Sequence, residues 1–223
     1  MRERDAALAE LMDDPLCDPR TLDRTYAAFR VLNPVVAGWR RTYRRVIRPL
    51  LSADEERTLL DVGSGGGDVA RSLARWAARD GLRLRVTGID PDPRAHSYAS
   101  ALPPVAGVSF RRAWLEDVPE RFDIVVSNHV LHHLDDVAGF LALSASRARV
   151  LSLHSDLARG RAAYAAFSML STPFFPGTFI RADGLTSLRR SYTAAELRDL
   201  VPMGWRVIPQ HPSRLLAVGV ARA

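Results

Sequence analysis

The chain has 223 residues, 47% of them hydrophobic, which suits one α/β domain with a well-buried core and argues against extensive disorder. Its formal charge of +6 comes from scattered arginines without interleaved aromatic residues, so we expect a solvated basic surface and no nucleic-acid groove. No apolar stretch follows Met1 or approaches the roughly 20 residues of a membrane span. We therefore expect no signal peptide, no membrane span and, with Cys17 as the single cysteine, a cytoplasmic location.

The first fifty residues have a helical pattern. Four apolar residues recur at helical spacing before Asn33-Pro34, namely Leu22, Tyr26, Phe29 and Leu32. A second helix is expected over residues 35–49. Residues 1–52 are therefore predicted to form an N-terminal helical cap.

From residue 53 onward, predicted strands and helices alternate. The strands are 58–62, 84–89, 108–112, 123–127 and 149–154, and the helices are 68–79, 93–101 and 136–145. Alternation of this kind predicts an α/β fold with a mostly parallel sheet and helices on both faces. Two further strands, 204–208 and 214–220, are separated by five residues, so they form a terminal hairpin with an antiparallel strand.

A glycine cluster follows the first predicted strand. The apolar run ends at Asp61-Val62, and Gly63, Gly65 and Gly67 then precede a helix, so that a ligand can approach bare backbone. The dinucleotide fingerprint would need glycine where Asp68 stands, and no Gly-Lys-Ser/Thr of a P-loop follows. The remaining pattern, Asp-x-Gly-x-Gly-x-Gly, resembles the first motif of the class I methyltransferases that depend on S-adenosylmethionine (SAM).

This resemblance implies a Rossmann-like, seven-stranded sheet with SAM at the carboxyl ends of its first strands. It implies that Asp61 meets the SAM ammonium and that Asp90 accepts both ribose hydroxyls. Trp114 stands where the family often has an acid facing adenine; it either covers the ring or packs in the core. The expected cofactor-binding residues are Asp61, Gly63, Ser64, Gly65, Gly67, Asp90, Pro91, Trp114, Leu115, Ser127 and Asn128.

Residues 122–136 resemble the fourth motif of the same family. Ser127-Asn128-His129-Val130 replaces the Pro-Pro-aromatic sequence of enzymes that methylate base amines, so adenine N6-methylation is not expected. The Leu-His-His-Leu sequence that follows is usual among small-molecule enzymes, including quinone and polyketide methyltransferases. On a helix, His129 and His133 would have the spacing of paired zinc ligands. No third ligand is near in the sequence, and Asp135 and Asp136 fit the start of the next helix, so no metal is expected.

A phenol with a pKa of about 10 must lose its proton to react near neutral pH. Histidine suits the role of base. His129 is the first candidate, and His154 at the end of the fifth strand is the second. For each, a structural hydrogen bond is the alternative.

The acceptor pocket is expected between the N-terminal helices and a lid at about 156–192 within the methyltransferase domain, 53–223. Thr193 and Glu196 then form a capping box on the next helix. The softer resemblance of this segment to a subgroup that tailors quinones or aromatic polyketides departs at Ala182, where histidine would be expected. The expected pocket residues are Tyr26, Trp39, Tyr43, Tyr164, Phe167, Phe175 and Phe179.

Together these features predict a SAM-dependent methyltransferase for a small aromatic molecule, as a monomer or homodimer. O-methylation of a phenol or quinol in natural-product or quinone metabolism is the leading prediction. Carbon methylation of an electron-rich ring, a SAM-binding regulator without catalysis and an RNA-binding methyltransferase remain open.

Overall fold

The computed structural model describes residues 3–35, 37–171 and 175–220. A seven-stranded sheet of order β3-β2-β1-β4-β5-β7-β6 lies at its centre. The strands are β1 (Arg57–Val62), β2 (Leu84–Asp90), β3 (Val108–Arg112), β4 (Phe122–Asn128), β5 (Ala148–Leu157), β6 (Arg206–Gln210) and β7 (Arg214–Val220). Among these strands β7 alone runs antiparallel to its neighbours, β5 and β6. The predicted sheet with its terminal hairpin is therefore confirmed.

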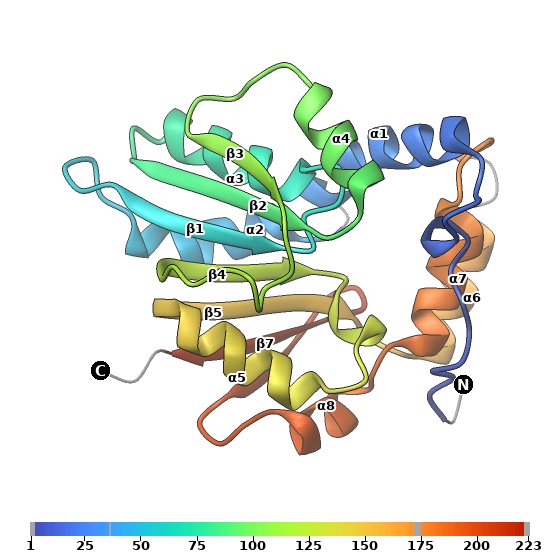
Figure 1. Ribbon diagram of the computed structural model, residues 1–223. Coiled ribbons are helices and arrows are strands. Elements are labelled where there is room, and N and C mark those ends of the chain that lie inside the picture. The colour runs from blue at the N-terminus through green and yellow to red at the C-terminus, as the bar shows by residue number, and fades with distance from the viewer. Residues whose placement is uncertain (1–2, 36, 172–174, 221–223) are drawn as a thin grey trace.

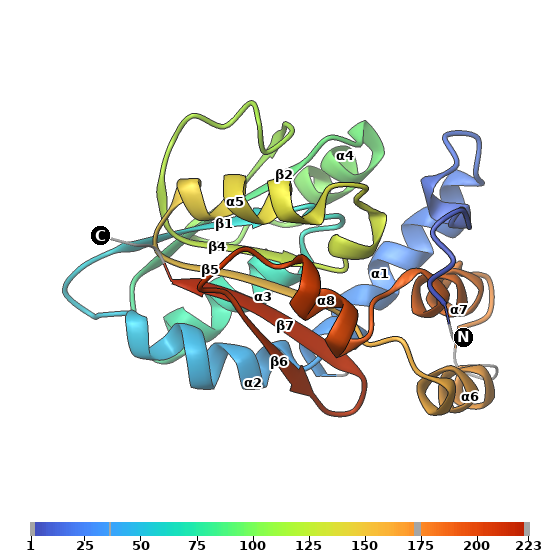
Figure 2. The ribbon, with the colours of Figure 1, turned by 90° about the horizontal axis from the view of Figure 1, so that it is seen from below.

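Helices lie on both faces of the sheet, as predicted (Figures 1 and 2). They are α1 (Pro19–Val35), α2 (Trp39–Thr42), α3 (Asp68–Arg79), α4 (Pro93–Ala101), α5 (Val137–Arg147), α6 (Arg161–Leu170), α7 (Ile180–Arg190) and α8 (Ala194–Leu200). Short turns are 3₁₀-helical at η1 (Leu11–Asp13), η3 (Arg48–Leu50) and η4 (Leu131–His133), and π-helical at η2 (Tyr43–Ile47). The capping box at Thr193 and the cap at Asp136 are confirmed.

Successive residues of β1 show why the central strands are apolar throughout. Leu59 packs with α3 on one face, whereas Leu60 and Val62 belong to a separate core on the other face, where Phe140 and Leu143 of α5 pack. Side chains of a strand alternate between faces, so a strand covered on both sides needs an almost continuous apolar run. This double burial fixes the carboxyl end of β1, where the glycine cluster begins.

The N-terminal helices differ from the prediction in their boundaries. Helix α1 continues through Asn33 and Pro34 to Val35, because a proline in the last turn removes only one backbone hydrogen bond. The next helix begins at Trp39, after Gly38 adopts a φ of 71° that interrupts the helical backbone. Residue 36 lies outside the described residues.

The N-terminal segment, α6 and α7 lie together at one end of the sheet (Figure 1). The parallel strands β1, β2 and β4 end there, and the strand order reverses between β1 and β4. Open α/β sheets bind ligands at such a switch point, outside the carboxyl ends of the strands. The fold thus leaves a site between the strand ends and the elements that cover them.

Candidate active site

A cavity of about 1120 Å³ opens at the carboxyl ends of β1, β2 and β4. It is larger than the usual small-molecule pocket of about 300–1000 Å³, so it has room for two ligands side by side. Its floor is the loop after β1, and its other walls come from the N-terminal segment, α1, α6 and α7. The apolar lining includes Phe29, Leu134, Phe140, Phe167, Leu170, Phe175, Ile180 and Leu188.

The loop after β1 turns sharply before α3. Gly63 has a φ of 65°, and a Cβ atom there would lie 2.6 Å from Cγ2 of Val130. Gly67 has a φ of 76°, and its Cβ would lie 2.4 Å from Cζ of Phe110. Both positions need glycine for the backbone conformation and for packing against neighbours. Gly67 does not line the cavity although Gly66 and Asp68 do, so its glycine is explained by the structure of the turn, and its expected contact with the cofactor stays a prediction.

Asp61 lies on the cavity wall with an unsatisfied oxygen. Its side chain is buried, and Oδ2 has no hydrogen-bond partner among the described residues. Burial, followed by repulsion from Asp68 and Asp90, raises the pKa of Asp61 well above its usual value. A buried carboxylate is costly without a charged partner. A cationic ammonium group would satisfy both the free oxygen and the charge.

Asp68 has a similar environment on the other side of the glycine loop. It begins α3, is buried, lines the cavity and also has an unpartnered Oδ2 within the described part of the chain. Burial raises its pKa to about 7. Sequence reasoning used Asp68 only to exclude a dinucleotide site, although an acid directly after a glycine turn was the available signal.

Asp90 ends β2 and reaches back to the glycine loop. Its Oδ2 accepts a hydrogen bond from the Gly65 backbone N–H at 2.8 Å, and its Oδ1 accepts one from Asp92 at 2.9 Å. Each carboxylate oxygen can accept a second bond, so a pair of ligand hydroxyls can still bind there. The expected contact with a ribose stays a prediction, now with both carboxylate oxygens held in position.

The remaining expected cofactor residues divide into two groups. Trp114 is 63% exposed and lines the cavity, so packing in the core is not its role. Ser127 is fully buried, donates to or accepts from Nδ1 of His154 at 2.7 Å and does not line the cavity, which corrects its expected role. Those that do line it are Gly63, Ser64, Gly65, Pro91, Leu115 and Asn128.

The donor set fits SAM. Two unpartnered buried carboxylate oxygens suit a ligand that carries an ammonium and a sulfonium, and Asp90 suits a ribose. The glycine loop would hold the amino-acid part, and Trp114 offers an aromatic face for the adenine.

His129 lies at the cavity wall in a constrained conformation. It has a φ of 61°, the only positive value among the described non-glycine residues, and its N–H donates to the Ser155 carbonyl at 2.9 Å. Its Nε2 accepts a hydrogen bond from the Arg214 guanidinium at 2.6 Å. Arginine can only donate, so the lone pair that would accept a proton is already occupied. Burial, followed by the charge of Arg214, holds the pKa of His129 well below its usual value.

His154 is not placed to act as a base. The side chain is fully buried within β5 and is not part of the cavity lining. Its ring nitrogens bond to Ser127, Ser144 and Ser152 at 2.7–2.9 Å. Burial lowers its pKa to about 3. The structural hydrogen bond was thus the correct alternative for His154, because the strand continues to Leu157 and leaves His154 inside the sheet.

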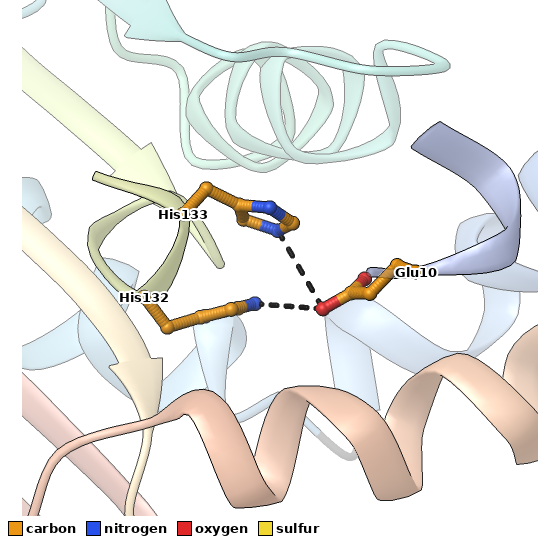
Figure 3. Close-up of side chains that lie close together, drawn as sticks. All are labelled: Glu10, His132 and His133. Atoms are coloured by element: carbon orange, nitrogen blue, oxygen red, sulfur yellow. Dashed lines mark hydrogen bonds and ion pairs between the residues drawn. The ribbon is translucent and has the colours of Figure 1, made fainter. Parts of the chain in front are cut away.

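A polar cluster that sequence reasoning missed lies at the lid side of the cavity. Nδ1 of His132 is hydrogen-bonded to Oδ1 of Asp156 at 2.7 Å. On the other side of the ring, Nε2 of His132 lies 3.2 Å from Oε1 of Glu10 (Figure 3). All three side chains are buried. Despite burial, the carboxylates of Asp156 and Glu10 raise the pKa of His132 to about 9. The position of Asp156 at the end of β5 was a sequence signal that could have identified it as a site residue. No sequence signal identified Glu10.

The lid and the N-terminal segment are joined by buried polar contacts. Asp183 of α7 accepts the backbone N–H groups of Leu11 at 2.7 Å and Met12 at 3.0 Å. Ser187, one turn further along α7, donates to Oε1 of Glu10 at 2.7 Å. Because α7 holds these three residues, Glu10 is placed over the cavity although it lies in an irregular segment.

The expected acceptor-pocket residues also divide. Tyr26, Phe167 and Phe175 line the cavity, whereas Tyr164 and Phe179 do not. Trp39 and Tyr43 are buried in the core against α3, and the Tyr43 hydroxyl donates to Asp80 at 3.0 Å. Their assignment to the pocket was wrong, because the chain after Gly38 packs under the sheet face instead of over the strand ends.

The structure also removes the predicted helical spacing of the histidines. Residues 131–133 form a single 3₁₀ turn, and His129 precedes it with a left-handed backbone conformation. His129 and His133 are therefore not successive positions on one helix face. Neighbouring His132 and His133 come together instead, with ring centroids 4.2 Å apart.

Comparison with known proteins gives consistent matches. A family described as "Methyltransferase domain" matches residues 60–151. A "Ubiquinone biosynthesis O-methyltransferase" of Paramagnetospirillum magneticum is 30% identical over 215 residues, covering 88% of this chain and 78% of that protein. A protein of the same name from Methylobacterium is 39% identical over 97 residues, which cover 41% of this chain and only 36% of that protein.

A solved structure shares the fold over nearly the whole chain. The plantazolicin methyltransferase BpumL, in complex with a triazolic desmethylPZN analog and SAH, superimposes with a TM-score of 0.66 over 96% of this chain and 93% of that one. At 14% identity this likeness concerns the fold alone. Within the described residues, no helix combines the length and apolarity needed to cross a membrane. With the glycine loop, the acids at the strand ends and the sequence match across most of a relative, the chain belongs to the class I SAM-dependent methyltransferases.

Proposed function

We propose that this methyltransferase transfers the methyl group of SAM to a hydroxyl oxygen of a phenol or quinol-like small molecule. The observation that carries the proposal is the single cavity that joins two unlike halves. One half presents the acids and the glycine loop, and the other presents apolar rings with one polar cluster. A flat, apolar acceptor with a hydroxyl group matches the second half.

Bound SAM supplies a methyl group on a sulfonium, which is already a strong electrophile. The protein must then exclude water, orient the acceptor and dispose of its hydroxyl proton. The aromatic lining from α6 and the segment before α7, with Phe167 and Phe175, excludes water from one side. The oxygen that attacks the methyl group becomes an ether oxygen, and the proton must leave before or during that step.

We assign the activation of the hydroxyl to the cluster of Glu10, His132, His133 and Asp156 instead of to His129. The Glu10 carboxylate is buried, lines the cavity at its lid side and lies 3.2 Å from Nε2 of His132. His129 has its accepting nitrogen occupied by Arg214. With Nε2 accepting, the ring proton is on Nδ1, so His129 can donate a hydrogen bond to a ligand but is a poor proton acceptor.

The names of the relatives support this chemistry. Two proteins similar to this chain carry the name "Ubiquinone biosynthesis O-methyltransferase", which denotes transfer to oxygen in a quinone pathway. The proposal extends to a lid at about 156–192, to residues 1–52 as a separate N-terminal part, and to a cytoplasmic monomer or homodimer. The N-terminal part is divided in the structure: residues 3–13 contact α7, whereas Trp39, Tyr43 and Ile47 belong to the sheet core.

The decisive experiment incubates the purified protein with SAM and a panel of phenols, catechols and quinols. A mass gain of one methyl group per product molecule is expected, and NMR of the product should show a methyl ether. The matched control is each acceptor with its hydroxyl already methylated, which should give no product. A ring-bound methyl group would establish carbon methylation instead. SAM binding without any product from the panel would favour a non-catalytic SAM-binding protein.

A further inference from the structure

Two adjacent histidines and a glutamate converge at the lid side of the cavity. Nε2 of His132 lies 3.2 Å and Nε2 of His133 lies 3.8 Å from the same Glu10 oxygen, Oε1 (Figure 3). The three ligand atoms all lie within 4.8 Å of one another. Two ligands of a tetrahedral zinc ion, each at roughly 2.1 Å from the metal, lie roughly 3.4 Å apart. The observed spacings bracket that separation.

The opposite nitrogen of each histidine is held by a carboxylate. Nδ1 of His132 lies 2.7 Å from Oδ1 of Asp156, and Nδ1 of His133 lies 3.4 Å from Oδ2 of Asp13. Histidines that bind metals almost always donate their second N–H to such a partner, which fixes the tautomer and presents the other nitrogen to the metal. Here both Nε2 atoms are presented toward Glu10.

The charges around the cluster favour a cation. Glu10, Asp13 and Asp156 are three acidic side chains around two imidazoles. Two arginines also reach the cluster: Arg4 donates to the His132 carbonyl, and Arg190 lies 3.9 Å from Asp13 and offsets part of its charge, which leaves Glu10 and Asp156 as the acids nearest to His132. The Glu10 oxygen also accepts from Ser187, which orients the carboxylate without adding charge.

We propose that Glu10, His132 and His133 bind one divalent transition-metal ion of the zinc class. The set of two nitrogens and one carboxylate oxygen leaves at least one coordination position free, as in catalytic zinc sites. All three residues line the cavity, so that position faces the acceptor half. This proposal departs from the expectation of no metal, because the third ligand comes from residue 10, which is 122 positions away from His132.

The chemical role of the ion rests on the proposed function. A hydroxyl of the acceptor would bind the free position as its oxyanion and release its proton to solvent, because a divalent cation lowers the pKa of a bound hydroxyl. That oxygen would then form the bond to the methyl carbon as the carbon–sulfur bond breaks. An ion here would therefore supply the activation for which neither His129 nor His154 is suited.

The test measures metal binding without SAM or acceptor. Tag-free protein is stripped with a chelator and titrated with Zn²⁺, Co²⁺ and Mg²⁺ by calorimetry, and the Co²⁺ complex is followed by its visible absorption. We expect one Zn²⁺ or Co²⁺ per chain and no comparable binding of Mg²⁺, which prefers oxygen ligands in an octahedral arrangement.

Variants locate the site. Glu10→Gln and His133→Ala should each abolish stoichiometric binding, and Asp13→Asn should weaken it by roughly 10-fold. His96→Ala on α4, which lies outside the cavity, is the matched control and should bind as the native chain does. His133 is partly exposed, so its variant decides the matter if Glu10→Gln does not fold.

Two results of the binding experiments would overturn the proposal, and one result of an activity assay would overturn the role of the ion. One is the absence of Zn²⁺ and Co²⁺ binding, which would leave His132 as a protonated bridge between Glu10 and Asp156. The other is binding that survives both Glu10→Gln and His133→Ala. In the activity assay, methyl transfer that proceeds fully in chelator would refute the role of the ion in activating the hydroxyl while leaving the O-methyltransferase proposal intact. Metal binding with no product from any acceptor would refute that function and leave the metal site standing.

Discussion

The two halves of the cavity are built in different ways. The cofactor half consists of Asp61, the glycine loop and Asp68, which are neighbours in the sequence, together with Asp90 from the next strand. The acceptor half brings Glu10, the turn at 131–133 and Asp156 together with α7, across separations of up to 177 residues. The first half therefore depends on local backbone geometry, and the second depends on how distant segments pack.

The polar groups of the two halves also differ in their bonding. In the cofactor half, Asp61 and Asp68 each retain a buried oxygen without a partner in the described structure. In the acceptor half, His132 and Asp156 are bonded to each other, and Glu10 bonds to both His132 and Ser187. Unsatisfied buried acids await a charged ligand, whereas the satisfied cluster is held in position before any ligand binds.

Among the tests of this contrast, the largest effect is expected at Asp61. Asp61→Asn should weaken SAM binding by roughly 10- to 100-fold, because a charged hydrogen bond contributes about 1.5–3 kcal/mol. The same change should leave the melting temperature of the free protein unchanged or raise it, because it removes an unpaired buried acid. Calorimetry and thermal unfolding measure the two effects, with exposed Asp54→Asn as the control. Unchanged SAM affinity would refute the role given to Asp61.

Asp183 tests whether the acceptor half depends on distant packing. Asp183→Ala should release the N-terminal segment from α7, because it removes the acceptor of two backbone N–H groups. Loss of these bonds costs about 1–3 kcal/mol locally, so we expect the acceptor KM to rise roughly 10-fold while SAM affinity is retained. Exposed Asp199→Ala is the control. A fall in SAM affinity as large as the rise in KM would show that the two halves are not independent.

The acids of the cofactor half predict a pH dependence. Burial raises the folded-state pKa of Asp68 to about 7 from 3.8, so the folded chain keeps a proton that the unfolded chain has released. The free energy of unfolding should therefore fall as pH rises between these two values. SAM affinity should rise over the upper part of that window, because ionised Asp68 attracts the cationic ligand. Asp68→Asn should flatten both profiles; identical slopes in the native protein and the variant would contradict the assignment.

The smallest effect is expected at Trp114, at the rim of the cofactor half. Trp114→Ala should weaken SAM binding by about 2- to 12-fold, in line with the 0.5–1.5 kcal/mol of an aromatic pair. Trp114→Phe should keep most of the affinity. SAM should quench part of the tryptophan fluorescence of the native chain and much less of the Phe variant's. Equal quenching in both proteins would place the adenine elsewhere.

The sequence predicted the elements of the sheet closely because each is encoded locally. Helices α3 and α4 and strands β3 and β7 have the predicted bounds. The ends of the other strands differ from the predicted positions by at most three residues. Apolar periodicity, capping residues and short links determine such elements without reference to the rest of the chain. The helices before β1 were less well predicted. Helix α1 does not end before Pro34, and the next helix begins only after Gly38.

The residues alone determined the α/β class, the family and the positions of Asp61 and Asp90 at strand ends, because a strand, a turn and a helix N-terminus are specified by one short motif. Only the tertiary structure placed His154 inside the sheet, Trp39 and Tyr43 in the core, and Arg214 on the ring of His129. It also brought Glu10 to His132 and His133. Contacts of this kind depend on how separate elements pack, and periodicity within a segment carries no record of which distant side chain it will meet.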